Sequence, residues 1–448
     1  MTSLNEHPTV QHFYEQGQAH AARTPPSVVD SAWLRQLCLE AGAGDVGFVE
    51  IERAELADQR RAIQAVFPHA KTLVSLVCRM NRENIRNTAR SVSNEEFHQT
   101  TDQLNHAARQ IVAALEQRGI RAMNPSAGFP MEMERFPGGK TWVISHKPVA
   151  VAAGLGRMGI HRNVIHPRFG SFVLLDTILI DAEVTVYDHP LDYNPCLECK
   201  LCVAACPVGA IGADGHFDFS ACYTHNYREF MSGFTDWVET VVESKGVRDY
   251  RQRVTESESA SMWQSLSFGA NYKSAYCMAV CPAGEDVIGP FLQQRQEFLK
   301  EVVRPLQDKT ETVYVVPRSD AETYVARHFP HKKVKRVHNG LRVLSIEAFL
   351  ANLPNTFQRH QAEGLNATFH FTFFGEEHRR ATVVIRNKSL HVQDGHQGRA
   401  DLHLSADSRT WLGFLAKERN LVWALVRRKI RIKGSPRMLL AFGRCFPT

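Results

Sequence analysis

Residues 196–207 read CLECKLCVAACP, a Cys-x2-Cys-x2-Cys-x3-Cys-Pro run. This spacing places cysteine thiolates where they can hold 4Fe–4S clusters. Three closely spaced thiolates, those of Cys196, Cys199 and Cys202, can wrap one cluster, and the fourth cysteine of such a run reaches a second cluster. A shorter run, Cys277-x3-Cys281-Pro282, follows. The two Cys-Pro endings predict that the chain transfers electrons one at a time.

Each cluster of this kind needs four ligands. The predicted ligands are Cys196, Cys199, Cys202 and Cys281 for the first cluster, and Cys206, Cys222 and Cys277 for the second. A complete second run would also have cysteines at positions 271 and 274, which are Asn271 and Ser274. The second cluster is therefore expected either as 4Fe–4S with a fourth ligand such as Ser274 or His225, or as 3Fe–4S, or not at all. Structural zinc fits less well, because zinc motifs pair two Cys-x2-Cys hairpins.

The composition is that of an ordinary globular protein, with 44% hydrophobic and 22% charged residues among 448. Seven of the ten cysteines lie between Cys196 and Cys281, which favours reduced thiols over disulfides and predicts a cytoplasmic protein. The N-terminus shows no signal peptide, and no run of about 18 apolar residues predicts a transmembrane helix. Cys38, Cys78 and Cys445 stand in apolar surroundings and are expected to be ordinary buried thiols.

Charge is distributed unevenly along the chain. Residues 331–448 hold 21 Lys and Arg against 8 Asp and Glu, a net charge of +13, whereas the remainder holds 32 against 39, a net charge of −7. Such a basic third suits nucleic acid, an anionic membrane, an acidic partner or simply a solvated surface. No aromatic-basic recognition motif is evident, so no nucleic acid partner is expected.

The periodicity of apolar residues divides the chain into four parts. Residues 1–190 alternate helical and strand-like segments and predict one α+β domain, in which 94–119 form a helix ending at Gly119 and 172–180 a strand. Residues 191–300 form the cysteine-rich module, with a helical insertion over 223–276, and residues 301–344 form a linker with one short strand and helix. Residues 345–448 predict four alternating strands, a helix, a short strand and a final helix.

Gly154, Gly156 and Gly159 form a Gly-x-Gly-x-x-Gly motif. A dinucleotide-binding motif of this type follows a strand, but the preceding PVAVAA pattern is helical, so a Rossmann site is not expected. The glycines are expected to let the backbone lie close to a flat cofactor or to a neighbouring strand.

The order AGLGRMGIHRN, PRFGSFVLLDTILID, CLECKLCVAACPVGAI and CMAVCP resembles epoxyqueuosine reductases and reductive dehalogenases over roughly residues 27–300. The resemblance implies a nitroreductase-like domain that binds base-off cobalamin, and a ferredoxin-like module whose two clusters reduce it. It also implies that two segments lie against the corrinoid. Their residues are Gly154, Leu155, Gly156, Met158, Gly159, His161, Arg162, Asn163, Arg168, Phe169, Gly170 and Ser171.

The resemblance is incomplete where a proton donor is expected. Epoxyqueuosine reductases carry an acidic residue ahead of the AGLG motif, whereas Ile144–Lys147 contain no acid, so this chain is not expected to be the queuosine enzyme. Reduction of a C–X, C–O or C=C bond requires a proton donor. His146 is the first candidate, because a histidine pKa near neutrality suits that role. The second candidate group is Tyr223, His225, Tyr227 and Arg228.

Residues 345–448 resemble sterol-carrier-protein domains through ATFHFTFFG, ATVVIRNKSLHVQDG, ADLHLSADSRTWLGFLAKE and RRKIRIKGSPRMLLAF. That family implies a five-stranded sheet and helices around an apolar tunnel for a lipid or steroid. An adaptor or dimerisation role is the alternative.

The sequence therefore predicts an iron–sulfur, cobalamin-dependent reductase of a small, apolar organic substrate, acting by dehalogenation or a related reductive cleavage. Its electrons would come from an external ferredoxin, flavodoxin or reductase. Two alternatives are an FMN-dependent nitroreductase-type enzyme and a non-catalytic protein that transfers electrons or reduces corrinoids.

Overall fold

The computed structural model describes residues 4–20, 26–131 and 142–447. The chain divides into two compact units. Unit 1 comprises Met1–Met80, Gln99–Met158 and Val164–Pro195, and unit 2 comprises Asn81–His98, Gly159–Asn163 and Cys196–Thr448. Among the described residues, no helix is both long and apolar enough to cross a membrane. The four-part division read from the sequence remains a prediction for its first three parts.

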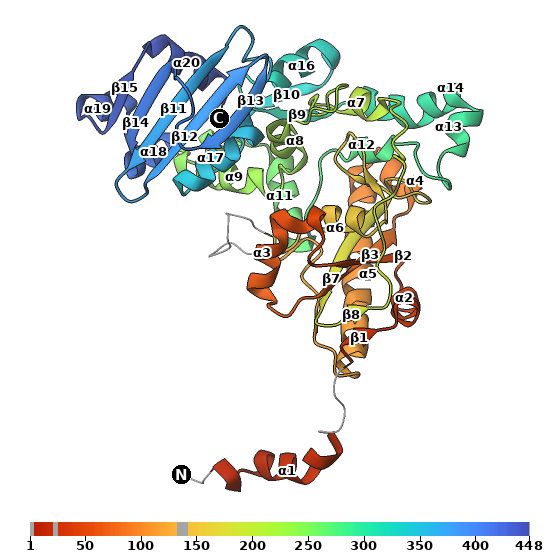
Figure 1. Ribbon diagram of the computed structural model, residues 1–448. Coiled ribbons are helices and arrows are strands. Elements are labelled where there is room, and N and C mark those ends of the chain that lie inside the picture. The colour runs from red at the N-terminus through yellow and green to blue at the C-terminus, as the bar shows by residue number, and fades with distance from the viewer. Residues whose placement is uncertain (1–3, 21–25, 132–141, 448) are drawn as a thin grey trace. The chain divides into compact units, whose positions relative to one another are not determined.

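Unit 1 is built on a four-stranded antiparallel sheet in the order β2-β3-β7-β4 (Figure 1). These strands are β2 (Asp45–Glu50), β3 (Thr72–Arg79), β7 (Val173–Ile180) and β4 (Ala122–Met123). The helices of this part of the chain are α1 (Pro8–His20), α2 (Ser31–Glu40), α3 (Ala57–Val66), α5 (Arg90–Glu116) and α6 (His146–Ala152). Short strands complete it: β1 (Val28–Val29) with β8 (Glu183–Val184), and β5 (Arg157–Met158) with β6 (Val164–Ile165).

The central strands β3 and β7 are buried on both faces, which is why they are almost uniformly apolar. Leu34 and Cys38 of α2 and Leu104, Ala108 and Ile111 of α5 pack with one side of this sheet. Val149 and Ala152 of α6 belong to a second cluster with Leu73 and Leu179. The predicted 94–119 helix is α5, which ends just before Gly119, a residue at φ 79°.

The iron–sulfur part of unit 2 consists of short helices joined by loops. They are α4 (Arg82–Arg86), α7 (Leu201–Ala205), α8 (Phe219–Asn226), α9 (Ser232–Glu243), α10 (Val247–Arg253), α11 (Glu256–Phe268), α12 (Tyr276–Ala279), α13 (Gly289–Gln293), α14 (Arg295–Phe298) and α15 (Arg304–Asp308). The predicted linker contains one strand more than the single strand and helix expected there. It holds β9 (Thr312–Val315), α16 (Asp320–His328) and β10 (Lys333–Arg336), and its two strands pair in parallel.

The C-terminal part of unit 2 is a five-stranded sheet in the order β13-β12-β11-β14-β15. Its strands are β11 (Ala367–Phe374), β12 (Arg379–Arg386), β13 (Ser389–Asp394), β14 (Leu402–Asp407) and β15 (Ile430–Lys433). Its helices are α17 (Ile346–Thr356), α18 (Ser408–Leu415), α19 (Leu421–Val426) and α20 (Pro436–Arg444). The single helix predicted over residues 408–426 is divided into α18 and α19, because Lys417 adopts a positive φ of 62° between them.

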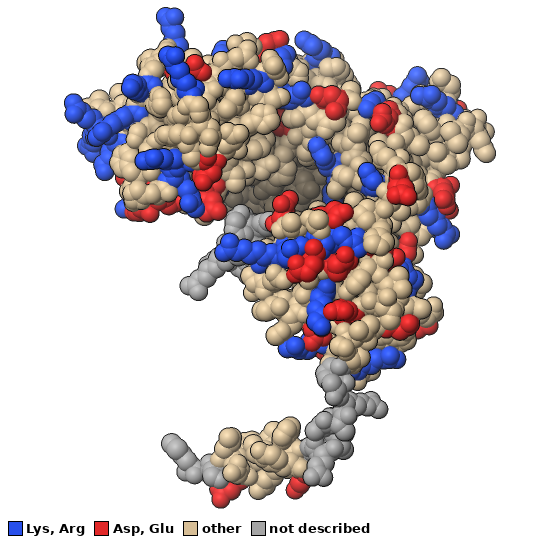
Figure 2. Space-filling view, viewed as in Figure 1, with Lys and Arg blue, Asp and Glu red and all other residues tan. Residues whose placement is uncertain are grey.

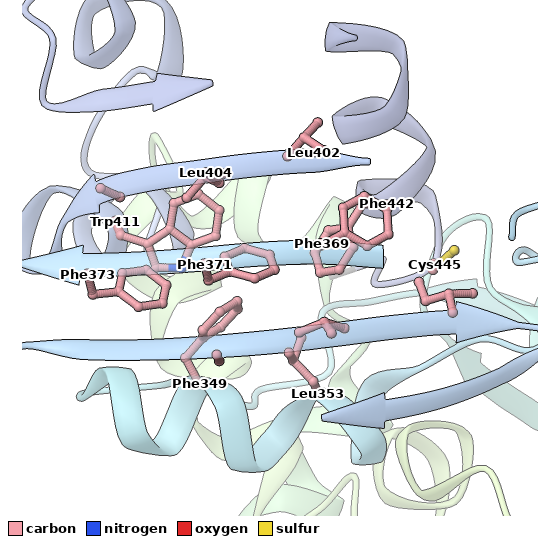
Figure 3. Packing of buried hydrophobic residues seen from close by; sticks show 14 of the residues in the cluster. Phe349, Leu353, Phe369, Phe371, Phe373, Leu402, Leu404, Trp411, Phe442 and Cys445 are labelled. Carbon is pink, nitrogen blue, oxygen red and sulfur yellow. The ribbon is translucent and has the colours of Figure 1, made fainter. Parts of the chain in front are cut away.

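Aromatic rings fill the interior of this C-terminal domain (Figure 3). Phe369, Phe371 and Phe373 alternate along β11, so all three point to one face of the sheet. The Phe371 ring lies 5.5 Å from that of Phe442 in α20 and 6.2 Å from that of Trp411 in α18. These rings form the packed core of the domain, and Phe349, Leu353, Leu415 and Phe446 also line a cavity of about 960 Å³ in unit 2.

Candidate functional site

Four cysteines from two distant segments surround one cavity in unit 2. Cys196, Cys199, Cys202 and Cys281 line it together with Ile160, His161, Lys200 and Pro282. Glu198 and Lys200 adopt positive φ angles of 52° and 61°, which curl the Cys-x2-Cys-x2-Cys loop around the cavity before α7 begins. Helix α12 packs on α7 and brings in the Cys281 thiol from the second segment. This is the ligand set predicted for the first cluster.

The thiols around this cavity are buried or half-buried and lie close enough to affect one another's pKa. Burial raises the pKa of the Cys202 thiol, and the neighbouring thiols of Cys277, Cys281, Cys199 and Cys196 raise it further. Such crowded thiolates need a bound cation or cluster to stabilise them. No three His, Cys, Asp or Glu side chains in the described part of the chain converge closely enough to hold one ion. Four thiols spaced around one cavity match the four ligands that a 4Fe–4S cluster needs.

Arg86 is a charged neighbour of this cluster that the sequence patterns did not reveal. Its Nε atom donates to the Ala279 carbonyl at 3.3 Å, and its guanidinium lies 5.3 Å from the centre of the Phe298 ring. Burial lowers the pKa of Arg86, while the Cys281 thiolate partly offsets that effect. A buried cation beside a cluster ligand favours the reduced, more negative cluster.

The three cysteines predicted for a second cluster occupy α8, α12 and the end of α7. The Cys206 sulfur accepts from the Ala210 amide at 3.3 Å, and Asn163 Nδ2 lies 3.8 Å from the Cys277 sulfur. Burial raises the pKa of the Tyr227 phenol, and the nearby Tyr272, Cys222 and Cys277 raise it further. Cys38, Cys78 and Cys445, the other cysteines of the chain, are buried elsewhere, as predicted. A second cluster would therefore lack a fourth thiolate and remains a prediction.

Ser274 and His225 are the two non-cysteine side chains expected as a possible fourth ligand of this second site. The Ser274 amide donates to Asn226 Oδ1 at 2.8 Å, which fixes the loop that leads into α12. His225 is fully buried, and its Nδ1 accepts from the Tyr314 amide at 3.3 Å. Burial and nearby cations hold the pKa of His225 well below its usual value. That histidine is therefore neutral and carries its proton on Nε2, which in this tautomer can donate a hydrogen bond but has no lone pair for a metal.

The four residues Tyr223, His225, Tyr227 and Arg228 do not form one catalytic group. The Tyr223 and Tyr227 rings stack at 5.7 Å beside the cysteines, and burial raises the pKa of both phenols. Arg228 instead binds Asp236 of α9 and lies over the Tyr314 ring at 5.2 Å. Phenols with raised pKa values keep their protons, so the structure leaves the tyrosines as neutral hydrogen-bond donors.

In unit 1, Gly154 and Gly156, the first two glycines of the Gly-x-Gly-x-x-Gly motif, allow close packing of the backbone. A Cβ on Gly154 would lie 2.5 Å from the His189 carbonyl oxygen, and one on Gly156 would lie 2.5 Å from the Ile165 carbonyl oxygen. Gly156 is thus needed where β5 and β6 pair, which favours the neighbouring-strand explanation of the motif over the flat-cofactor one. The motif follows helix α6, as expected for a sequence that is not a Rossmann loop.

The remaining residues assigned to the corrinoid differ in exposure. Leu155, Gly159, His161, Phe169, Gly170 and Ser171 are buried, whereas Arg162 and Arg168 are exposed and Met158 and Asn163 are half-buried. Arg168 lies over the Phe169 ring, which stacks on His166, and His166 in turn binds Asp45 at 2.9 Å. These contacts join the second implied segment to Asp45 of β2.

A buried acid lies beside His146, the first candidate proton donor. His146 Nε2 lies 3.2 Å from the Ser126 carbonyl oxygen and Nδ1 lies 3.0 Å from the Thr177 hydroxyl. Because a carbonyl oxygen only accepts, Nε2 carries the proton and Nδ1 accepts from Thr177. The Asp176 carboxylate lies 3.8 Å from Nδ1.

Burial shifts the two groups in opposite directions. It lowers the pKa of His146 to about 4 and raises that of Asp176 to about 7. The near-neutral pKa expected for His146 therefore does not hold, since desolvation disfavours the imidazolium. Asp176 is the group of this pair that holds a proton near neutral pH. The sequence signal for it is an aspartate in the middle of the apolar strand FVLLDTILI.

Family models match two parts of the chain, the cysteine-rich segment and the C-terminal domain. The family model described as 4Fe-4S binding domain matches residues 189–212, and that of the SCP-2 sterol transfer family matches residues 346–447. The epoxyqueuosine reductase of Cellulophaga algicola is 33% identical over 112 residues, which are 22% of this chain and 36% of that protein. That of Aliivibrio fischeri is 26% identical over 166 residues, 37% of this chain and 40% of that protein.

The resemblance to epoxyqueuosine reductases and the sterol-carrier-like C-terminal domain are confirmed. The chain spans between 22% and 40% of the length of the first four curated relatives that it matches. The solved structures found similar include the catabolic reductive dehalogenase NpRdhA in complex with 3-bromo-4-hydroxybenzoic acid, at 15% identity and a TM-score of 0.37, covering 61% of this chain and 35% of that one.

A second solved structure corrects one expectation. It is an epoxyqueuosine reductase with an epoxyqueuosine-modified tRNA stem loop, at 16% identity and a TM-score of 0.34, covering 61% of this chain and 75% of that one. The prediction that the chain has no nucleic acid partner was wrong. The curated relatives are epoxyqueuosine reductases, and an enzyme of that name has been solved with a tRNA stem loop. The sequence showed no basic-aromatic motif, and the absence of a motif was too weak a ground for excluding RNA.

Proposed function

We propose that the chain is an iron–sulfur oxidoreductase of the epoxyqueuosine reductase type, which passes electrons from a 4Fe–4S cluster to an organic substrate. The observation that carries the proposal is the single cavity surrounded by Cys196, Cys199, Cys202 and Cys281. The substrate to test first is epoxyqueuosine in a tRNA stem loop, because the curated relatives bear that activity in their names. This replaces the sequence-based view that the chain is not a queuosine enzyme.

The objection to that substrate was the missing acid ahead of the AGLG motif, and Asp176 supplies a candidate acid. Converting an epoxide to an alkene takes two electrons and two protons and releases water. With its pKa raised to about 7, Asp176 is about half protonated at neutral pH and can donate its proton there. Neutral His146 lies 3.8 Å away, and the Thr177 hydroxyl donates to its Nδ1. We assign Asp176 as the proton source and His146 as a residue that positions it.

Cobalamin is the proposed electron acceptor between cluster and substrate, on the family resemblance. When bound, it would supply a strongly reducing metal centre. In unit 1, the half-buried Met158 and the exposed Arg168 are the residues of the implied segments that are proposed to contact it.

An absorption spectrum with a turnover assay tests the proposal. Anaerobically reconstituted protein should show the broad iron–sulfur absorption together with bound cobalamin. With a chemical reductant, it should remove one oxygen atom from an epoxyqueuosine-containing stem loop, as mass spectrometry would detect. A flavin spectrum would instead establish the nitroreductase-type alternative. Clusters without either chromophore and without turnover would establish an electron-transfer protein.

A further inference from the structure

Helix α19 (Leu421–Val426, LVWALV) is apolar around its whole circumference, yet it lies at the surface. Ala424 is buried, and Leu421 and Leu425 pack against the core of the C-terminal domain. The other side of the helix faces outward. It carries Val422, Trp423 and Val426, which are 66%, 63% and 67% exposed. A helix that is apolar on all sides is normally buried on all sides. The fold therefore explains only half of this helix.

Cations follow these exposed apolar residues directly. The chain turns from α19 through Arg427, Arg428 and Lys429 into β15, where Ile430 and Ile432 join the core and Arg431 and Lys433 alternate with them on the opposite face. All five cations are exposed. In Figure 2, Lys and Arg atoms gather at the left edge of the molecule, over α19 and β15. The α19–β15 patch is defined here as Val422, Trp423, Val426, Arg427, Arg428 and Arg431.

Almost none of this positive charge is neutralised within the protein. Residues 419–448 contain no Asp or Glu. Within the ranges that the structure describes, Lys429 approaches Asp407 at 3.9 Å, whereas Arg427, Arg428 and Arg431 form no ion pair with a carboxylate. Arg427 instead lies 5.8 Å from the centre of the Trp423 ring. The patch thus presents three apolar side chains next to three unneutralised guanidinium groups.

We propose that the α19–β15 patch docks the protein on an anionic lipid bilayer. Apolar side chains on a short surface helix gain stability in the acyl boundary of a membrane, and adjacent arginines gain it at lipid phosphates. Tryptophan is favoured at that interface, because its ring is apolar and its N–H is polar.

Two other occupants fit the patch less well. RNA would match the arginines and stack on Trp423, but it would leave Val422 and Val426 in water. A second copy of the chain would bring two arginine clusters together, because a symmetric dimer contacts the same surface on both copies. The lipid surface is the occupant that uses both the apolar and the cationic residues.

Flotation of the full-length protein with vesicles tests the proposal. The protein should float with vesicles of phosphatidylcholine mixed with phosphatidylglycerol, and float less at high salt or with phosphatidylcholine alone. Trp423→Ala should weaken vesicle binding at least about tenfold, because a large buried apolar surface is lost. Arg427→Gln combined with Arg428→Gln should weaken it by about 25-fold, since each cation near an anionic surface contributes about fivefold.

Matched controls separate this patch from general surface effects. Trp263→Ala removes another exposed tryptophan, which is 56% exposed in α11, and should leave vesicle binding unchanged. Arg386→Gln combined with Arg399→Gln removes the same charge from other exposed sites of the domain and should also leave it unchanged. Trp423→Phe should retain binding, which shows that a loss in Trp423→Ala does not come from misfolding.

Three results would overturn the proposal. The first is equal vesicle binding by wild type and the patch variants. The second is patch variants that lose binding to an RNA stem loop but not to vesicles, which would make the patch an RNA site. The third is a dimer in solution that Trp423→Ala dissociates. None of these results depends on whether the chain reduces epoxyqueuosine.

Discussion

At the residue scale, the ten cysteines fall into two chemical classes that their surroundings separate. Seven lie in the helices and loops of the iron–sulfur module, where thiols face one another. Cys38, Cys78 and Cys445 are buried among apolar side chains, and burial raises the pKa of Cys78 and Cys445 to about 11. No other cysteine contributes to the pKa shifts of Cys38, Cys78 and Cys445, whereas four neighbouring thiols raise the pKa of Cys202.

Cys281→Ser should therefore remove the first cluster, because Cys281 is the one ligand of that cavity that comes from the distant segment. We expect the iron content to fall by about four atoms per chain, measured by colorimetric iron and sulfide analysis of anaerobically reconstituted protein. Cys445→Ser is the matched control, since its thiol donates to the Ala441 carbonyl at 3.4 Å and a hydroxyl can do the same. Equal iron loss in both variants would contradict the assignment.

Asp176 allows a prediction about pH. Its folded pKa of about 7 lies above its ordinary value of 3.8, so the folded state binds the proton more tightly than the unfolded state. The stabilisation that this proton gives is complete below about pH 4 and is lost as pH rises through 7. Infrared spectra should show a protonated-carboxyl band that disappears as pH rises through about 7 and is absent in Asp176→Asn.

The same variant tests the catalytic assignment. Asp176→Asn should lower the turnover of reductase activity and leave the iron content and the affinity for substrate unchanged, because the site lies in unit 1 and holds no cluster ligand. Thr177→Val is the companion variant, which removes only the hydroxyl that donates to His146. If the carboxyl band persists in Asp176→Asn, it belongs to another acid, and Asp176 is not protonated.

At the element scale, periodicity predicted the long and regular segments well and the packing of short ones poorly. The strands β3, β7 and β11 are apolar or alternating runs, and each appears where the sequence placed it. The proximity of Asp176 to His146 was not predictable, because it depends on α6 lying against β7, a contact between residues about 30 positions apart. The cavity ligands were predictable, since the spacing of thiolates in a cluster motif is set by the cluster itself.

The loop before α12 carries the next prediction. Ser274 stands where a complete second run would have cysteine, three residues before Cys277, and its amide is already fixed by Asn226. Ser274→Cys should complete a four-thiolate set with Cys206, Cys222 and Cys277, and should raise the iron content toward about eight atoms per chain. Electron paramagnetic resonance would show the conversion of a 3Fe–4S signal, where one is present, to that of a reduced 4Fe–4S cluster. Ala270→Cys, which adds a thiol four residues earlier, should not raise the iron content, and an equal gain in both variants would contradict a specific site.

At the scale of the whole molecule, the predicted linker is a structural support of the iron–sulfur module. Glu311, just before β9, accepts from the Tyr276 hydroxyl at 2.7 Å and from the fully buried Lys332 ammonium at 2.9 Å. The Tyr314 amide in β9 donates to His225 in α8. These contacts hold α8 and α12, the helices that carry Cys222 and Cys277. The contacts from the C-terminal domain are fewer, with Gln358 donating to Asp218 at 3.0 Å and Arg359 pairing with Asp214 at 2.6 Å.

Two truncations should therefore differ in the iron that they retain. A chain ending at Leu344 keeps β9, α16 and β10 and should retain the iron content of the full chain. A chain ending at Pro305 lacks Glu311, the partner of Tyr276, and Tyr314, the partner of His225. Cys222 and Cys277 should then lose their fixed positions, and the iron content should fall. Iron and sulfide analysis, with thermal unfolding followed by circular dichroism, measures both effects. Equal iron in the two truncated chains would show that the segment from 306 to 344 is only a connection, whereas iron loss in both would show that the sterol-carrier-like domain itself supports the clusters.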